Sequence, residues 1–326
     1  MLKPVLCGGE ILLDFISKEV DKGLGHSTLF EKRLGGSIFN VAVGLRRLGV
    51  LVSFLTKIGG DEFGQGLIDT IRAEKINTEY LKRDANLKTT LAFVAINKEG
   101  KPEFRFYREN AADTMLTVSE VKDINPKNYS MYHFGSISLL EKPASDAYLL
   151  LLDMFHRKKI ITSFDPNVRP SLIKDKENFL NMFFKISELV NILKMSDEDL
   201  RYISGSKNIK ESLKKIPNKN NSLILVTLGK HGVVSYYKGQ FTHVPTFNEI
   251  KIRETTGCGD AFMAAIIYKL LKSDDSITFL SKSKLIDILN FANGVATIVG
   301  TRYGASNSMP YLSEVNKFIS LSKKKK

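Results

Sequence analysis

Short apolar runs bounded by turns recur along the sequence, and most of them are followed by a segment with helical periodicity. Such runs are typical of parallel strands that helices cover on both faces. The pattern predicts an α/β fold with a doubly wound, mainly parallel sheet flanked by helices. The expected strands are 5–7, 52–58, 132–137, 160–164, 189–195 and 223–228, and the expected helices are 37–48, 64–74, 144–157, 197–203, 260–271 and 284–299.

Two segments interrupt this alternation, at about 10–33 and 89–112. The second has two strand-like runs joined by a turn at 98–101, which is the pattern of a hairpin. Because neither segment contains a helix, neither fits the main sheet. We expect them to form a small β lid over the carboxyl edge of the large sheet, where open α/β sheets bind ligands. The remaining pattern predicts a single domain over 1–326.

The composition narrows the class of protein. Lys and Arg outnumber Asp and Glu by 48 to 35, and four of the positive charges are Lys323 to Lys326. The other basic residues are scattered, so we expect no nucleic-acid partner and favour an enzyme that handles phosphate anions.

No apolar stretch is long enough for a membrane span, and the first residues do not resemble a signal peptide. The two cysteines, Cys7 and Cys258, indicate a reducing compartment, so we expect a cytoplasmic protein.

The stretch 254–262 contains a Gly-x-Gly pair that ends on an aspartate and precedes an apolar run. A helix there places the amides of Gly257, Cys258 and Gly259 at its N-terminus, where they attract an anion. Asp260, beside this anion hole, could take a hydroxyl proton while the amides hold the charge of a moving phosphoryl group. A plain loop with an N-cap aspartate is the alternative. The helix N-terminus could also make the Cys258 thiol reactive by lowering its pKa.

A second glycine motif occupies 35–49 and starts with Gly35 and Gly36. Paired glycines let a ligand approach the backbone closely, and Asn40 offers a donor and an acceptor to a sugar hydroxyl. The alternative is an outward-facing Asn on a helix that begins at a glycine. Together, the two glycine motifs resemble the N-terminal and C-terminal signatures of the PfkB/ribokinase family of carbohydrate kinases. The resemblance continues between them and covers nearly the whole chain.

This resemblance implies ATP-dependent phosphorylation of a sugar hydroxyl. Asp260 would be the general base, and Gly257, Cys258 and Gly259 the anion hole, although the family usually has Ala at the Cys258 position. The segment 227–232 resembles the family's nucleotide loop, and Arg169 could pair with phosphate oxygens. The implied ATP-binding residues are Asn167, Arg169, Ser196, Thr227, Gly229, Gly232, Gly259 and Asn293.

The resemblance also implies metal ions. Magnesium would be held mainly by ATP phosphates and water. Asp199 stands where ribokinases have a glutamate that influences magnesium, but a capping box for the next helix is an equal interpretation. A monovalent cation, potassium, is implied next to the anion hole, with Glu254 where ribokinases have Asp. The implied cation ligands are Glu254, Thr256, Val299, Arg302, Gly304 and Ser308.

Asp14 matches the family aspartate that accepts two substrate hydroxyls, and 104–113 resembles the lid strand of fructokinases. We therefore expect fructose as the substrate and fructose 6-phosphate as the product. The alternative is 2-keto-3-deoxygluconate, whose carboxylate would need Arg108 or Arg169.

A sugar sensor without catalysis is disfavoured because Asp260 is present. The lid strands could form a homodimer, but a monomer fits equally well. The implied substrate-binding residues are Asp14, Gly35, Gly36, Asn40, Phe106, Arg108 and Arg169.

Overall fold

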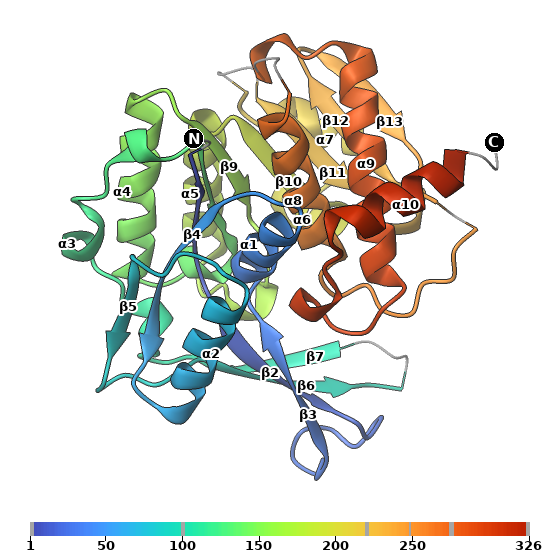
Figure 1. Ribbon diagram of the computed structural model, residues 1–326. Helices are drawn as coiled ribbons and strands as arrows, with labels where there is room; N and C mark the ends of the chain where they lie inside the picture. The colour runs from blue at the N-terminus through green and yellow to red at the C-terminus, as the bar shows by residue number, and fades with distance from the viewer. Residues whose placement is uncertain (1–2, 99–101, 219–221, 248, 274–276, 324–326) are drawn as a thin grey trace.

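The computed structural model describes residues 3–98, 102–218, 222–247, 249–273 and 277–323, and nine strands of this described part form one large sheet (Figure 1). Its strand order is β13-β12-β11-β10-β9-β8-β1-β4-β5. The strands from β5 to β11 pair in parallel, and β12 and β13 add an antiparallel edge. This confirms the predicted mainly parallel sheet. The strands are β1 Val5–Gly8, β4 Val52–Gly59, β5 Leu81–Asp84, β8 Met131–Gly135, β9 Ile161–Asp165, β10 Ile192–Ser196, β11 Leu223–Thr227, β12 Val233–Tyr237 and β13 Gln240–Val244.

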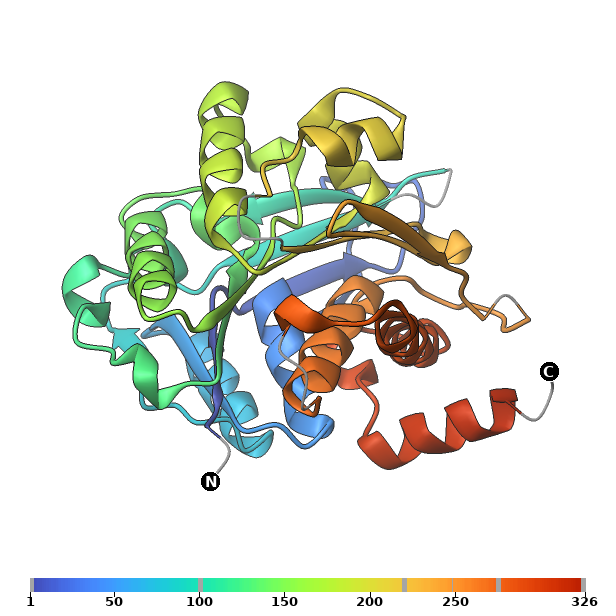
Figure 2. The same cartoon turned by 90° about the horizontal axis from the view of Figure 1, so that it is seen from above.

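Helices cover both faces of the sheet, and each face has its own apolar core (Figure 2). Among the described residues, none of these helices combines the length and apolar character needed to cross a membrane. One layer contains α1 Ser37–Arg47, α2 Glu62–Ala73, α8 Cys258–Leu271, α9 Lys282–Gly300 and α10 Leu312–Lys323. The other contains α3 Val118–Val121, α4 Ala144–Arg157, α5 Lys176–Leu189, α6 Asp197–Ser204 and α7 Ile209–Lys215. Short 3₁₀ turns span Ala112–Thr114, Pro126–Asn128, Ser136–Leu139, Pro170–Leu172, Gly229–His231, Ile277–Phe279 and Ser306–Ser308.

Helix α8 is apolar on nearly all sides, and this sequence feature explains its position. It packs against both α1 and α9, so it is enclosed on both flanks. A helix that is hydrophobic all round belongs in the interior of a protein. Its N-terminus therefore starts inside the molecule, and a polar residue in its first turn, such as Asp260, is buried with it.

A separate four-stranded sheet forms from the two segments that interrupt the βα alternation (Figure 1). Its order is β3-β2-β6-β7, and aromatic side chains hold it together, with Phe15 and Phe93 stacked at 5.1 Å between ring centroids. Part of the predicted turn at 98–101, residues 99–101, lies outside the described residues. The strands are β2 Leu12–Ser17, β3 Phe30–Gly35, β6 Leu91–Ile96 and β7 Pro102–Tyr107.

Some element boundaries differ from the prediction. Strand β8 ends at Gly135, whose φ is 147°, and a Cβ atom there would lie 2.0 Å from the carbonyl oxygen of Asp165. The chain therefore turns sharply before Ile137 instead of continuing as a strand. The expected start of β10 is also wrong, because α5 extends to Leu189 and the strand begins at Ile192. Helices α3, α5, α7 and α10, strand β5 and the β12–β13 hairpin were not predicted.

Candidate active site

A cavity of about 770 Å³ lies at the carboxyl ends of the central parallel strands, next to the small sheet. Parallel strands end at the same edge of a sheet, so residues that are distant in sequence meet there. Glu10 follows β1, Ser136 follows β8, Asn167 follows β9, Ser196 ends β10 and Gly229 follows β11, and all five line the cavity. The volume is that of a site for a small molecule or a cofactor.

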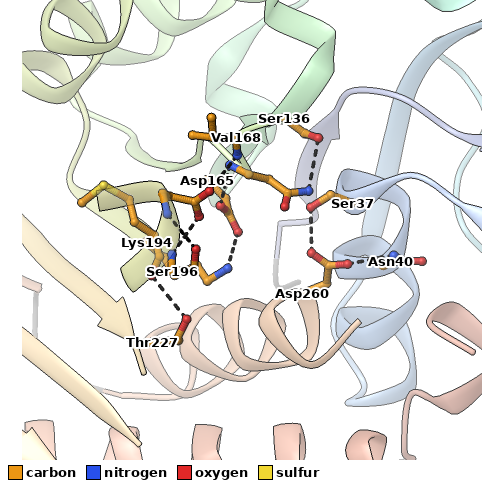
Figure 3. Close-up of polar contacts among 12 residues, drawn as sticks. Ser37, Asn40, Ser136, Asp165, Val168, Lys194, Ser196, Thr227 and Asp260 are labelled. Carbon is orange, nitrogen blue, oxygen red and sulfur yellow. Dashed lines mark hydrogen bonds and ion pairs between the residues drawn. The ribbon is translucent and has the colours of Figure 1, made fainter. Parts of the chain in front are cut away.

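Asp260 lies in this cavity, in the first turn of α8 and only 9% exposed. Its Oδ1 accepts a hydrogen bond from Ser37 Oγ at 2.7 Å, and its Oδ2 accepts one from Asn40 Nδ2 at 2.8 Å (Figure 3). Burial raises the pKa of Asp260, while Lys194 and these two hydrogen bonds oppose the rise. The carboxylate is thus held in one orientation and is a stronger base than an exposed aspartate.

The amides at the start of α8 have different environments. Gly257 is the N-cap residue with a φ of 79°, and Cys258 N–H donates to Thr255 O at 3.1 Å. Within the described chain, the N–H groups of Gly257 and Gly259 have no acceptor, so they remain available to an anion. Burial, together with the charges of Asp260 and Glu254, raises the pKa of the Cys258 thiol to about 12. The alternative of a reactive thiolate is therefore wrong.

Lys194 is a site residue that the sequence analysis missed. Its side chain is 6% exposed, lines the cavity, and places Nζ 2.8 Å from Asp165 Oδ2 (Figure 3). A Cβ atom on Gly259 would lie 2.7 Å from Nζ, so the ammonium is against the N-terminus of α8. Burial lowers the pKa of Lys194, but the carboxylates of Asp165, Asp199 and Asp260 outweigh burial and raise it above its usual value. The site therefore contains a permanent positive charge.

A signal for Lys194 was present in the sequence, because it interrupts an otherwise apolar strand whose two faces are both covered. A lysine in such a strand is rarely buried unless it is paired.

Glu10 was also missed. It follows the first strand directly, is almost fully buried, and accepts hydrogen bonds from the Ser37 N–H at 3.0 Å and from the Ser138 hydroxyl. Burial raises the pKa of Glu10.

The part of the cavity under the small sheet contains Asp14, from β2. Burial raises the pKa of Asp14 to about 6, although the guanidinium groups of Arg169 and Arg33 act in the opposite direction. A Cβ atom at Gly35 would lie 2.5 Å from Asp14 Oδ2, so this glycine leaves room for the carboxylate. Asn40 lines the same space, and its buried Oδ1 makes no hydrogen bond within the described chain. Gly35, Gly36, Phe104, Phe106 and Arg169 also line the cavity.

Arg108, which was expected to bind the substrate, is not among the described residues that line the cavity. It follows β7 and is buried, and its Nε donates to Asp113 Oδ2 at 2.9 Å. An ion pair between buried side chains holds the guanidinium in this position. Of the two arginines considered for the substrate, the structure brings only Arg169 to the cavity.

The chain after β11 and the middle of α9 also contribute residues to the cavity. Gly232 has a φ of 89°, and a Cβ atom there would lie 2.1 Å from the carbonyl oxygen of Val244. Asn293 Nδ2 donates to Pro245 O at 3.0 Å and so holds the chain that leaves β13. Thr227, Gly229, Gly232, Gly259 and Asn293, all predicted to bind ATP, line the cavity.

Asp199 contacts the loop that follows β9 and also lines the cavity. Its Oδ1 accepts from Val168 N–H at 2.9 Å, and its Oδ2 accepts from Ser196 N–H at 2.8 Å. Ser196 Oγ accepts in turn from Asp199 N–H at 3.0 Å. This reciprocal pair is a capping box for α6, so that interpretation is confirmed, and the indirect magnesium role stays a prediction. Within the described ranges, no cluster of three or more His, Cys, Asp or Glu side chains could hold a metal ion.

The residues implied for the monovalent cation lie together next to α8. Glu254 accepts from Arg33 Nη1 through both oxygens, at 3.0 and 2.9 Å, and from Gly304 N–H at 3.1 Å. The one carboxylate of the predicted ligand set is therefore already paired with a cation of the chain itself.

Two of the other predicted cation ligands, Val299 and Ser308, also have partners within the chain. Val299 O accepts from Arg302 N–H at 2.9 Å, and Ser308 O accepts from Arg302 Nη1 at 3.1 Å. Ser308 Oγ donates to Tyr303 O at 2.8 Å. The arginine side chain thus crosses the loop that was expected to present oxygens to an ion.

The family model for pfkB family carbohydrate kinases matches residues 3–312. Fructokinase-1 of Zea mays is 32% identical over 316 residues, which cover 97% of each chain, and fructokinase-2 of Solanum lycopersicum is 32% identical over 94% of this chain and 93% of its own. A fructokinase from Xylella fastidiosa with bound ATP superposes with a TM-score of 0.87 at 30% identity, covering 99% of this chain and all of the other. A double mutant of a Vibrio cholerae fructokinase, with bound fructose, ADP and potassium ion, superposes with a TM-score of 0.84 at 25% identity over 97% and 98% of the chains. With a family model spanning nearly the whole chain, this protein belongs to the pfkB family of carbohydrate kinases.

Proposed function

We propose that the protein transfers the γ-phosphoryl group of ATP to the primary hydroxyl of fructose and so produces fructose 6-phosphate. The observation that carries this proposal is the position of Asp260. It lines the same cavity as Asp14 and Asn40, next to the small sheet, and as Gly229, Gly232 and Asn293, from the chain after β11 and from α9. The fructokinases among the relatives, one of them with fructose and ADP bound, support the choice of sugar.

The sugar would bind under the small sheet. The Asp14 carboxylate can accept two hydroxyl protons, and the unpartnered Oδ1 of Asn40 can accept a third. Gly36 has no side chain to obstruct this approach, and Phe106 supplies an apolar wall. We propose that 10–33 and 89–112 act as a lid, which excludes water and thereby suppresses ATP hydrolysis.

The nucleotide would lie across 227–232 and Asn293, with its phosphates directed at the start of α8. Asp260 accepts the proton of the primary hydroxyl, whose oxygen attacks the γ-phosphorus as the bond to the bridging oxygen of ADP breaks. The N–H groups of Gly257 and Gly259 and the ammonium of Lys194 stabilise the charge of the transferring group.

Magnesium would enter with ATP, held by phosphate oxygens and water, since both oxygens of Asp199 are bonded to backbone N–H groups. Bound there, the ion would neutralise part of the phosphate charge. The cavity fits this arrangement because Asp197 and Glu198 add carboxylates to its wall.

A second candidate substrate is 2-keto-3-deoxygluconate. The observation in its favour is Arg169, which lines the cavity and is close enough to Asp14 to act on its pKa. A guanidinium in a sugar site can pair with a substrate carboxylate. Fructose needs no such partner, so Arg169 distinguishes the two candidates.

The test is ADP release by the purified protein with fructose, 2-keto-3-deoxygluconate, ribose, tagatose 6-phosphate and adenosine in parallel. We expect turnover with fructose and its loss in Asp260→Asn, which keeps the size of the side chain but removes the base. Turnover confined to ketodeoxygluconate, and abolished by Arg169→Met, would establish the second candidate. A protein that binds ATP and sugar but releases no ADP would contradict both and indicate a sensor.

A further inference from the structure

An ion pair joins the small sheet to the loop that leads into α8. Arg33 belongs to β3 and is paired in register with Asp14 of β2. Its Nη1 contacts both oxygens of Glu254, at 3.0 and 2.9 Å, and the two residues are 221 positions apart. Glu254 is followed by 255–257, whose last residue is the N-cap of α8. The strand pair that carries Asp14 is therefore tied to the anion hole.

The residues present do not fit a potassium ion at this place. An ion that relied on the charge of Glu254 would have to share that carboxylate with the positive guanidinium of Arg33, at a separation where like charges repel. Gly304 N–H donates to the same carboxylate at 3.1 Å. The carboxylate is thus surrounded by donors of the chain.

The surroundings make this ion pair stronger than one on the surface. The side chains are only 17% and 20% exposed, so salt screens them weakly. Arg33 Nε also donates to Glu31 at 2.7 Å, which fixes the plane of the guanidinium. Burial acts to raise the pKa of Glu254, but the hydrogen bonds from Thr256, Gly304 and Arg33 lower it below its usual value. Both groups therefore stay charged.

We propose that the guanidinium of Arg33 takes the place of a monovalent cation beside the anion hole, so that this kinase works without potassium. The positive charge at this place belongs to a strand of the small sheet, so no ion from solution has to supply it. Because Arg33 and Asp14 are cross-strand neighbours, the sheet that holds the sugar also orients the amides of Gly257 and Gly259. The predicted effect of potassium on the reaction rate rests on the proposed function, but its predicted effect on the unfolding midpoint does not.

The test compares potassium chloride with tetramethylammonium chloride at equal ionic strength, for thermal unfolding and for sugar-dependent ADP release. An ion that binds the native state raises the unfolding midpoint. For the wild type we expect no shift of the midpoint and less than about a twofold change in rate. Arg33→Met leaves Glu254 unpaired, so potassium should raise its midpoint and increase its rate about tenfold.

Two matched variants control this experiment. Arg33→Lys keeps a positive charge and should stay insensitive to potassium. Lys32→Met removes an exposed charge from the same strand and should behave as the wild type. The double variant Arg33→Met/Glu254→Gln has no carboxylate to hold an ion, so the response gained by Arg33→Met should disappear.

A potassium-dependent midpoint or rate in the wild type would overturn the proposal, whether or not the variants fold. So would an Arg33→Met protein that unfolds at the same temperature in both salts. If Arg33→Met does not fold, Arg33→Gln is the substitute. A protein that phosphorylates no sugar in the panel would refute the proposed function only, because the unfolding midpoints still decide this inference.

Discussion

Asn40 Nδ2 donates to Asp260 Oδ2 across 2.8 Å, although the two residues are 220 positions apart in the sequence. The contact depends on how closely α1 approaches α8. A Cβ atom on Gly44 would lie 2.8 Å from the Cβ of Ala264, so these helices touch where one has no side chain. The second glycine motif thus contributes to the active site through Gly44, one turn from Asn40, as well as through its paired glycines.

Enlarging this helix contact should damage the site from a distance. We expect Gly44→Val to destabilise the fold by about 1–3 kcal/mol through overpacking, and to reduce kcat further by moving Asn40 away from Asp260. Ala264→Gly in the same chain should restore part of both. Denaturant unfolding and steady-state kinetics measure the two effects. A Gly44→Val enzyme with normal kcat would show that the helix spacing does not control the base.

Replacing the base should separate chemistry from binding. We expect Asp260→Asn to lower kcat by about 10²–10⁴ and to leave the Kd for sugar nearly unchanged, because the amide keeps the shape of the site. Calorimetric titration with sugar gives the Kd. Lost sugar binding with unchanged turnover would refute the assignment of Asp260.

Lys194 should affect both the size and the pH dependence of the rate. We expect Lys194→Met to reduce kcat by about 10²–10³. Since Lys194 lowers the pKa of Asp260, its loss should raise that pKa further, and activity should fall more at acid than at alkaline pH. A kcat profile against pH tests this.

The buried partner of Lys194 needs its own control. Lys194→Met alone leaves Asp165 as an unpaired buried charge, which costs about 3–5 kcal/mol. Asp165→Asn in the same chain removes that charge. If the double variant recovers both stability and full activity, Lys194 is structural and has no role in phosphoryl transfer.

Sugar affinity should depend on pH through Asp14, whose pKa is raised to about 6. A protonated carboxyl group cannot accept two hydroxyl bonds, so the KM for sugar should rise as pH falls through about 6. The pKa of Asp14 is higher in the native state than in the unfolded chain, so the native state takes up the proton more readily. The free energy of unfolding should therefore increase as pH falls from about 6 toward the usual pKa of an aspartate. Asp14→Asn should show a high KM and a flat profile. A wild-type KM that is constant from pH 5 to 8 would contradict this role.

The sequence predicted the features that depend on local pattern. The βα alternation indicated the parallel sheet, and the stretch around Asp260 indicated a glycine-rich helix N-terminus. What it missed depends on tertiary contacts. In the sequence, Ser37 is only the first residue of a predicted helix and Lys194 only a lysine in a predicted strand. Their contacts with Asp260 and Asp165 form only when the chain has folded. The Arg33–Glu254 pair joins two segments with no shared sequence pattern.

The two hydrogen bonds on Asp260 have a consequence for the timing of each reaction cycle. Ser37 and Asn40 hold the carboxylate in a single rotamer without any help from a sugar. Its remaining lone pairs are free to receive an incoming hydroxyl. A mobile base would have to adopt the reactive rotamer again for each substrate molecule. Asp260 already holds that rotamer once the chain has folded.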